Sequence, residues 1–406
     1  MSPAEKMVYL SGAPRVSTKP QAAIGGARTR ALGMIRGFEQ AGFAVSPFIA
    51  GDRCREFLIR ADFDAKAKKN IWIRILSDLL RLGYACKNGA IVFFRYKKYP
   101  LAYEMLGLMQ FLGFFLKLRG AFWILETNAL LFKESFFARE ATFFWRSARF
   151  IEKKCYQKAD LIVTVTAGTM RDVMEFAALS ADKIIVIPNG VDPEAFQSAA
   201  VAGKRFFLEP TIGFVGVMYA WQGLAMLLKA VHDLKKEGVF YKIVLVGDGP
   251  EYGRLQKMAA ELALQADVVF TGRIPPKAVP NFIAGMDICY AGQVSETGGE
   301  TSRSPIKTYE YLAMKKPVLS CDFEDAKKIV REGVNGFLFQ SGNPENLLRG
   351  LRKAFRQRQD WPAMGEAGYG IVAADHTWKR RVQLLLHKMK GDERKRENEK
   401  KHGQAL

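Results

Sequence analysis

The stretch YKIVLVGDGPEYGRLQKMAAELAL, residues 241–264, decides the fold class of this chain. It begins with an apolar run that predicts a buried strand over Tyr241–Val246. Gly247-Asp248-Gly249-Pro250 then predicts a turn, and the apolar spacing from Glu251 to Leu264 predicts a helix, with Pro250 suited to its first turn. A strand, a glycine-containing turn and a helix in this order are typical of a parallel α/β sheet.

The same alternation recurs on both sides of this stretch, which favours doubly wound parallel sheets. We expect further strands at 7–12, 43–49, 90–94, 121–125, 161–166, 184–187, 211–217, 268–271, 288–291 and 317–320. We expect further helices at 28–40, 71–82, 138–156, 224–236, 306–314 and 378–388, and a short one from residue 281.

The chain length predicts two domains, because 406 residues are too many for one hydrophobic core. A polar, irregular stretch between Asp192 and Pro210 separates the two series of strands. We therefore expect Rossmann-like domains at 1–196 and 210–375. A C-terminal helix is expected at 376–390, and the charged residues 391–406 contain almost nothing apolar and are expected to be disordered.

The charge of the chain limits its partners. The formal net charge is +20, and residues 1–200 hold 29 Lys and Arg against 18 Asp and Glu. Such an excess suits an anionic membrane surface, a phosphate-bearing substrate or nucleic acid. The sequence carries no nucleic-acid recognition motif, so we expect no nucleic-acid partner.

The cysteines and the apolar segments bear on location. Five scattered cysteines indicate a reducing compartment, and the N-terminus lacks the pattern of a signal peptide, so we expect a cytoplasmic protein. The most apolar stretch, Met105–Leu116, is too short to cross a bilayer. It is expected to form either a buried core helix or a surface at the membrane interface, which would make the protein peripheral on the inner face.

A second glycine-containing loop leads into a helix at Gly298–Met314. Ser304 is expected to cap this helix and Pro305 to occupy its first turn, so that backbone N–H groups face an anion. Lys307 opposes the helix dipole there unless an anion binds nearby. Glu310 lies one turn further on and suits a ribose diol, although the two side chains would also make an ordinary surface pair.

Six segments in order resemble the retaining glycosyltransferases of the GT4 family, in the subgroup with the SPxKxxEY pattern. They are IPNGVD, GFVGVMYAWQGLAMLLKA, LVGDGPEYGRLQKMA, FTGRIPPKAVPNFIAGMDICYA, SPIKTYEYLAMKKPVLS and EGVNGFLF, between about Ile184 and Phe339. The resemblance implies the GT-B fold, in which two Rossmann-like domains face across a cleft and a C-terminal helix crosses back to the first. It also implies a nucleotide-sugar donor, UDP- or GDP-linked, and a hexosyltransferase reaction without a metal or another cofactor.

The resemblance also implies roles for individual residues. Glu310 matches the family glutamate that holds the nucleotide ribose, and the loop before it matches the segment that meets the donor sugar and diphosphate. The donor-binding residues implied are Gly216, Gly247, Gly249, Gly272, Arg273, Ile274, Gly298, Ser302, Arg303, Ser304, Ile306, Lys307 and Glu310. For Gly247 and Gly249 a purely structural turn is the alternative.

The sequence departs from the family pattern at three positions. Ser302 replaces a frequent glutamate, Val217 a frequent arginine, and Gln222 the usual lysine. Two phosphate-binding cations are therefore missing. We expect Lys307 to take over the pyrophosphate together with Arg303, since the leaving diphosphate requires a cation.

The first domain resembles the family less closely. Gly25 and Gly26 resemble the loop that lines the cleft, and Glu126 and Asn128 lie at a strand end where many relatives place a histidine. We expect these two side chains to contact the donor sugar or the acceptor hydroxyl, and a cap or buried hydrogen bond is the alternative for each. Lys307, Glu310, Glu126 and Asn128 are thus the candidate catalytic residues.

Two other classes of protein remain as comparisons. A dinucleotide oxidoreductase would carry a strand-linked GxGxxG motif, which the sequence lacks. A catalytically inactive member of the same fold, which binds a nucleotide-sugar or acts as a partner subunit, is the stronger alternative because of Val217, Gln222 and Ser302. The acceptor is expected to be a glycan or a lipid-linked molecule in cell-envelope polysaccharide or glycolipid synthesis.

Overall fold

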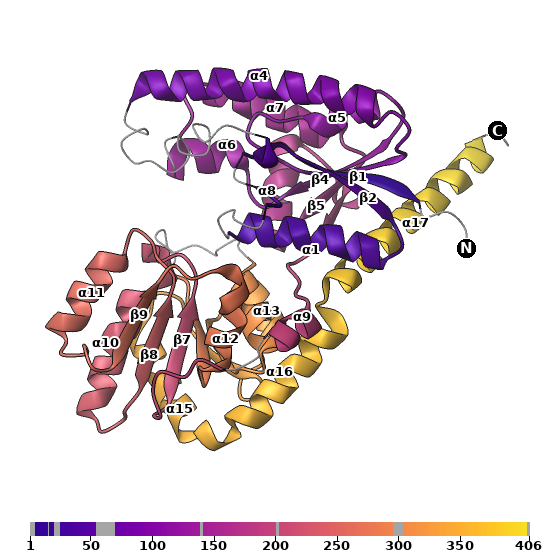
Figure 1. Cartoon of the computed structure of the whole chain (residues 1–406). Coiled ribbons are helices and arrows are strands. Elements are labelled where there is room, and N and C mark those ends of the chain that lie inside the picture. Colours follow the sequence, from indigo (N-terminus) through magenta and orange to yellow (C-terminus); the bar gives the residue numbers. More distant parts are fainter. Residues whose placement is uncertain are drawn as a thin grey trace. The chain divides into compact units, whose positions relative to one another are not determined.

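A computed structural model of the chain describes residues 5–14, 16–19, 25–53, 70–138, 141–199, 203–294 and 304–403. The chain divides into two compact units, which are described one at a time (Figure 1). Unit 1 comprises Met1–Pro188 and Trp378–Leu406, and unit 2 comprises Asn189–Thr377. The boundary falls earlier than the sequence predicts, because α9 (Pro193–Ala199) packs on helices of unit 2.

Unit 1 is built on a parallel sheet of six strands in the order β2-β1-β3-β4-β5-β6. Its strands are β1 (Lys6–Ser11), β2 (Ala44–Ile49), β3 (Leu101–Met105), β4 (Phe122–Thr127), β5 (Leu161–Thr164) and β6 (Ile184–Val186). Its helices are α1 (Gly26–Gln40), α4 (Ile71–Arg95), α5 (Leu112–Lys117), α6 (Leu131–Lys133), α7 (Trp145–Lys158), α8 (Ala167–Ala177) and α17 (Trp378–Gly403).

Unit 2 repeats the plan, with strand order β12-β11-β10-β7-β8-β9. Its strands are β7 (Thr211–Val215), β8 (Lys242–Val246), β9 (Val268–Gly272), β10 (Ile288–Ala291), β11 (Val318–Cys321) and β12 (Gly336–Phe339). Besides α9, its helices are α10 (Leu224–Lys236), α11 (Tyr252–Glu261), α12 (Val279–Ala284), α13 (Ile306–Ala313), α14 (Glu324–Ile329), α15 (Pro344–Arg356) and α16 (Trp361–Asp375).

Alternate residues of each central strand enter two different cores, one on either face of the sheet. In β8, Ile243 and Leu245 join the core beside α10 and α15, whereas Val244 and Val246 join the core beside α12 and α13. Burial on both faces explains why this strand reads as a continuous apolar run. The predicted α/β fold with two doubly wound, Rossmann-like parallel sheets is confirmed.

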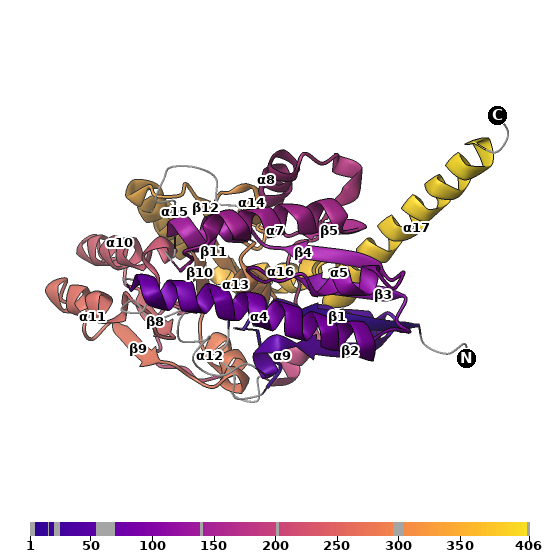
Figure 2. The same cartoon turned by 90° about the horizontal axis from the view of Figure 1, so that it is seen from above.

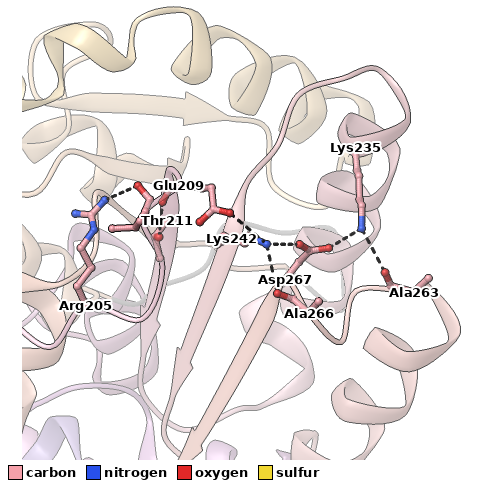
Figure 3. A network of polar contacts seen from close by, with 9 residues as sticks. Arg205, Glu209, Thr211, Lys235, Lys242, Ala263, Ala266 and Asp267 are labelled. Carbon is pink, nitrogen blue, oxygen red and sulfur yellow. Dashed lines mark hydrogen bonds and ion pairs between the residues drawn. The ribbon is translucent and has the colours of Figure 1, made fainter.

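A polar network fixes the segment that enters β7 (Figure 3). Asp267 accepts hydrogen bonds from Lys242 of β8 and Lys235 of α10, each at 2.7 Å. Arg205 pairs with Asp287 at 3.1 Å, and the Thr211 amide donates to the same carboxylate at 2.9 Å. Because Arg205 is exposed, these contacts orient the segment more than they stabilise it.

The predicted strand at 90–94 is wrong, because these residues lie inside α4, which runs from Ile71 to Arg95. Asn70 caps the helix by accepting from the Trp72 and Ile73 amides. A run of five apolar residues does not distinguish a strand from a buried helical segment, and the strand next in the chain is β3, which the sequence reading missed.

The apolar stretch Met105–Leu116 contributes to the core of unit 1. Met105 ends β3, and only residues from Leu112 onward are helical. Leu112 and Leu116 are buried against β1 and α4. The predicted core role is therefore correct, although the helix is shorter than expected, and the membrane-interface alternative does not fit these buried side chains.

The charged C-terminal segment differs from the prediction. Residues 391–403, expected to be disordered, continue α17 as helix to Gly403. The segment has almost no apolar residues, but Lys, Arg and Glu are good helix formers and make favourable pairs one turn apart. Local propensity thus extends the helix where packing would not.

The start of α17 packs on α1 through glycines. A Cβ on Gly33 would lie 2.1 Å from the Trp378 indole, and one on Gly37 would lie 2.6 Å from the Trp378 carbonyl oxygen. Trp378 and Val382 are buried in the same core as Met34 and Phe38. The two glycines therefore allow the C-terminal helix to complete unit 1.

We predict that Gly33→Ala lowers the free energy of unfolding by about 1–3 kcal/mol, because the new methyl group forces the indole out of its site. Urea denaturation monitored by tryptophan fluorescence measures the change. Gly83→Ala is the matched control, since no atom lies within 4 Å of its Cβ and alanine favours a helix. Equal stability of the two variants would contradict this packing role.

Candidate functional site

The loops after β7, β8 and β9 are joined by backbone hydrogen bonds at the C-terminal edge of the second sheet. The Gly216 amide donates to the Val246 carbonyl at 3.0 Å, and the Met218 amide donates to Asp248 at 2.9 Å. Gly247 in turn donates to Gly272 at 3.0 Å. In parallel α/β sheets this edge is where ligands bind.

Gly247 and Gly249 allow two of these loops to touch. A Cβ on Gly247 would lie 2.1 Å from the Gly216 carbonyl oxygen, and one on Gly249 would lie 2.5 Å from the Met218 nitrogen. Gly247 also has a φ of +124°, which side chains disfavour. The two glycines thus have a structural role, and their contact with a diphosphate stays a prediction.

Lys307, in the first turn of α13, reaches this edge. Its Nζ donates to Gln222 Oε1 at 2.7 Å and lies 4.1 Å from the centroid of the Phe214 ring. A Cβ on Gly216 would be 3.4 Å from the same nitrogen. The structure therefore brings Lys307, Gln222 and Gly216 together, as a cation beside an exposed loop backbone.

Burial lowers the pKa of Lys307 and raises the pKa of Glu310, so the two values approach each other. Desolvation lowers the pKa of Lys307 to about 7, against the opposing effect of the Glu310 charge. Desolvation likewise raises the pKa of Glu310 to about 7, against the effect of Lys307. Two titratable groups with pKa values displaced in this way, at a sheet edge suited to ligands, are typical of a functional site.

The cap of α13 differs from the prediction. The N-cap residue is Pro305 rather than Ser304, and Ile306 is the first helical residue. Ser304 instead binds Asn189, whose Nδ2 donates to the Ser304 carbonyl oxygen at 2.6 Å. The contact attaches the start of α13 to the turn after Pro188. Of the predicted donor-loop residues, Gly298, Ser302 and Arg303 lie outside the described residues.

The predicted base-framing residues follow the end of β9. Gly272 ends the strand with a φ of +66°, Arg273 is exposed, and Ile274 packs against the core beside α13. Because Gly272 accepts from Gly247, this stretch is tied to the same loops as Gly216. Its contact with a base stays a prediction.

In unit 1, Glu126 is held in a buried ion pair. Its carboxylate lies 3.0 Å from Arg30 Nε, both side chains are almost fully buried, and Tyr103 donates its hydroxyl hydrogen to the other oxygen. Arg30 also donates to the Ile187 carbonyl at 2.9 Å. Glu126 therefore links β4 to α1 and to the end of β6, which corresponds to the structural alternative for this residue.

Asn128 lies beside a small cavity of about 40 Å³ in unit 1. The cavity is also lined by Glu126, Glu134 and Ala27, and it has room for about three water molecules. Within the described part of the chain, Asn128 Oδ1 is buried and has no hydrogen-bond partner. Gly25 caps α1 and Gly26 begins it, next to Ala27. Glu126, Asn128 and Glu134 form the polar side of the cavity, and its apolar side includes Met105 and Leu131.

Among the described residues there is no group of three or more His, Cys, Asp or Glu side chains arranged to hold a metal ion. None of the helices in the described ranges is both long and apolar enough to cross a membrane.

Several residues of these sites were not found from the sequence. Gln222 was noted only as a missing cation, and its contact with Lys307 depends on a fold that joins positions 85 residues apart. Arg30 and Tyr103 carried no signal, because nothing in their local sequence indicates a partner on β4.

Comparison with known proteins places two regions in named families. Residues 204–370 match the family described as "Glycosyl transferases group 1", and residues 120–195 match "Glycosyltransferase Family 4". The first match lies within unit 2, and the second covers the later part of unit 1 and extends a few residues past the boundary into unit 2.

The curated relatives are similar at low identity. An uncharacterized glycosyltransferase of Methanocaldococcus jannaschii is 27% identical, over 63% of this chain and 64% of its own length. The D-inositol 3-phosphate glycosyltransferase of Nocardia farcinica is 26% identical, over 58% and 53%. A GDP-mannose-dependent alpha-(1-6)-phosphatidylinositol monomannoside mannosyltransferase of Mycobacterium tuberculosis is 23% identical, over 57% and 62%. The aligned region thus spans between half and two thirds of these relatives.

Solved structures agree over nearly the whole chain. Sucrose-phosphate synthase from Thermosynechococcus elongatus has a TM-score of 0.69 at 17% identity, and covers 96% of this chain and 100% of its own. The Anabaena protein HepE in complex with UDP has a TM-score of 0.64 at 17% identity, and covers 95% and 100%. At this identity the likeness concerns the fold.

We predict that the Arg30–Glu126 pair acts in stability rather than in chemistry. Arg30→Met alone is expected to cost about 3–5 kcal/mol in the free energy of unfolding, because it leaves the Glu126 carboxylate buried without its cation. The double variant Arg30→Met/Glu126→Leu is expected to cost less than the sum of the two single variants. Additive costs in a denaturant-based cycle would show that the two side chains are not coupled.

Proposed function

Since the chain belongs to the family 4 glycosyltransferases with the GT-B fold, we propose that it transfers a sugar from a nucleotide-sugar to an acceptor, with retention of anomeric configuration. The observation that carries the proposal is the position of Lys307, whose ammonium group lies between Gln222 and Gly216 at the ligand-binding edge of the second sheet. A half-buried cation beside a glycine loop at this edge of the sheet suits a diphosphate.

The donor would bind unit 2 through complementary groups. Lys307 would neutralise the diphosphate, and Gln222 would orient the ammonium group and offer its own amide N–H to a phosphate oxygen. Glu310, one turn along α13, would accept hydrogen bonds from the ribose hydroxyls. Relatives of this fold with bound UDP support a UDP-linked donor.

The proposed chemistry needs no protein base. The bond between the anomeric carbon and the diphosphate oxygen breaks, a bond from the acceptor oxygen to the same face of that carbon forms, and the acceptor proton passes to the departing phosphate. The buried pairing of Glu126 with Arg30 and Tyr103 supports this route, because these contacts engage both oxygens of the carboxylate.

We propose that the reaction proceeds without a metal and that the protein works in the cytoplasm. The placement of Lys307 supports the first point, since its charge would replace that of an ion at the diphosphate. The free thiols of Cys86, Cys155, Cys289 and Cys321 support a reducing compartment.

For the acceptor, we propose a glycan or a lipid-linked molecule used in envelope polysaccharide or glycolipid synthesis. One relative carries phosphatidylinositol monomannoside in its name, which supports a lipid acceptor. The basic charge of the chain agrees with substrates and surfaces that bear phosphate.

The proposed activity predicts slow hydrolysis of at least one UDP- or GDP-sugar by the purified chain, and faster release of the nucleotide with a suitable acceptor. A donor panel read by nucleotide release measures it, and added EDTA is expected to leave the rate unchanged. Binding of a nucleotide-sugar without turnover of any donor and acceptor pair would instead favour the catalytically inactive alternative, which Val217 and Gln222 motivate.

Lys307 predicts a specific pH dependence of UDP binding. The ammonium is present below its pKa of about 7 and is lost as pH rises, so binding requires proton uptake above pH 7. The Kd of UDP is therefore expected to increase by up to about tenfold per pH unit above that value. Isothermal titration between pH 6 and 9 measures this slope.

Two variants separate this effect from the titration of UDP itself. Lys307→Arg keeps its charge throughout and is expected to flatten the slope, whereas Lys307→Ala is expected to weaken binding at pH 6 by roughly 10- to 100-fold. An identical slope in wild type and Lys307→Arg would show that Lys307 does not bind the diphosphate.

A further inference from the structure

Helix α4 is amphipathic in the reverse sense of an ordinary surface helix. Its buried positions include Ser77, Asp78, Arg81 and Asn88, each no more than 6% exposed. Several of its large apolar side chains point outward instead: Ile71, Trp72, Leu76, Leu79 and Phe94 are 48–74% exposed, whereas Val92 and Ile91 pack into the core. In a helix that covers a sheet, the apolar stripe normally faces the core.

The outward apolar residues form one continuous stripe. Trp72, Leu76 and Leu79 follow the i, i+4, i+7 spacing of a single helix face, and Ala90 and Phe94 continue that face toward the C-terminal end. The helix lies on the outside of unit 1 in both views (Figures 1 and 2). The 25 residues extend for about 37 Å. We call this surface the α4 stripe.

The polar side of α4 is held inward by satisfied hydrogen bonds, so its orientation is fixed. Arg81 donates to Asp78 at 2.6 Å, and the Asp78 carboxylate accepts from the amides of Phe143 and Phe144 at 2.8 and 2.9 Å. These amides precede α7, whose start is thereby attached to α4. Turning the apolar face inward would break all of these bonds.

The surroundings of the α4 stripe are positively charged. Between Ile71 and Lys98 the only acidic residue is Asp78, which is buried, while the basic residues Lys87, Arg95, Lys97 and Lys98 are exposed. At the same end, the Arg119 guanidinium lies 3.8 Å from the centroid of the Phe93 ring, next to Leu118, which is 62% exposed. Within residues 71–98, the stripe therefore has a basic rim without an exposed acid.

We propose that the α4 stripe docks the protein on the surface of an anionic lipid bilayer, with the helix parallel to the membrane plane. Exposed Trp, Leu and Phe would enter the boundary between headgroups and acyl chains, and the basic rim would contact lipid phosphates. Two copies of the stripe placed face to face would bring these cations together, so the charge favours an anionic bilayer over a second copy. The docking itself does not rest on the proposed function. Only its use, which is to bring the protein to a lipid-linked acceptor, rests on it.

The test uses the full chain and vesicles of phosphatidylcholine, with or without phosphatidylglycerol, in a co-sedimentation assay. Binding is expected for vesicles with phosphatidylglycerol and is expected to weaken with added salt. The double variant Leu76→Gln/Leu79→Gln is expected to lower the partition coefficient by roughly tenfold or more, since two apolar side chains no longer enter the interface. Lys97→Gln/Lys98→Gln is expected to reduce binding to anionic vesicles alone.

The matched control is Leu208→Gln/Phe240→Gln, which replaces two exposed apolar residues of unit 2 and is expected to bind as wild type. Melting temperatures check that the polar replacements leave folding intact. Equal vesicle binding by the stripe variant and wild type would overturn the proposal. So would a wild-type dimer in sedimentation equilibrium that the stripe variant abolishes, without vesicle binding. The vesicle assay needs no donor, so its result is independent of any failure to find transferase activity.

Discussion

The close approach of two backbone segments, Gly216–Met218 and Gly247–Gly249, is the constraint on which the C-terminal edge of the second sheet depends. The Gly216 carbonyl lies where a Cβ on Gly247 would be, so only glycine permits the contact. The contact aligns the loops after β7 and β8, and the Gly247 amide adds the loop after β9. Because these loops are held by main-chain bonds rather than by side chains, the edge is rigid before any ligand binds, which lowers the entropy cost of binding.

The arrangement of charge at this edge follows from desolvation. Burial of the ammonium group is unfavourable and the Glu310 charge offsets this only in part, which explains why the pKa of Lys307 falls to about 7. A second lysine at position 222, as in the family pattern, would add repulsion to the same few ångströms. Gln222 instead accepts from Lys307 and contributes no charge, so Lys307 is the cation that the described residues place beside Gly216.

The sequence predicted those features that depend on local pattern. The apolar run of β8, the glycine turn after it and the first turn of α13 were identified, because period and turn residues are local. The sequence did not identify the partner of Lys307. Gln222 is distant in sequence and was interpreted only as the loss of a lysine. For Glu126, too, the sequence could not show which side chains lie nearby in the fold. A carboxylate at the C-terminal end of a strand suggests chemistry, but the side chains of Arg30 and Tyr103, which only the fold brings to it, give it a structural role.

In helix α4 the sequence predicted the start of the helix correctly but wrongly predicted a strand at residues 90–94. The sequence predicted a helix from Ile71 onward, but not which of its faces turns inward. Asp78 decides this by accepting hydrogen bonds from the amides that precede α7. These hydrogen bonds turn the polar face inward, so the apolar face points outward. No residue between Ile71 and Lys98 is an exposed acid. A soluble protein rarely leaves so large an apolar stripe without a partner, because exposed patches of this kind favour aggregation. The same hydrogen bonds that shape unit 1 therefore also fix the direction in which it meets a partner surface.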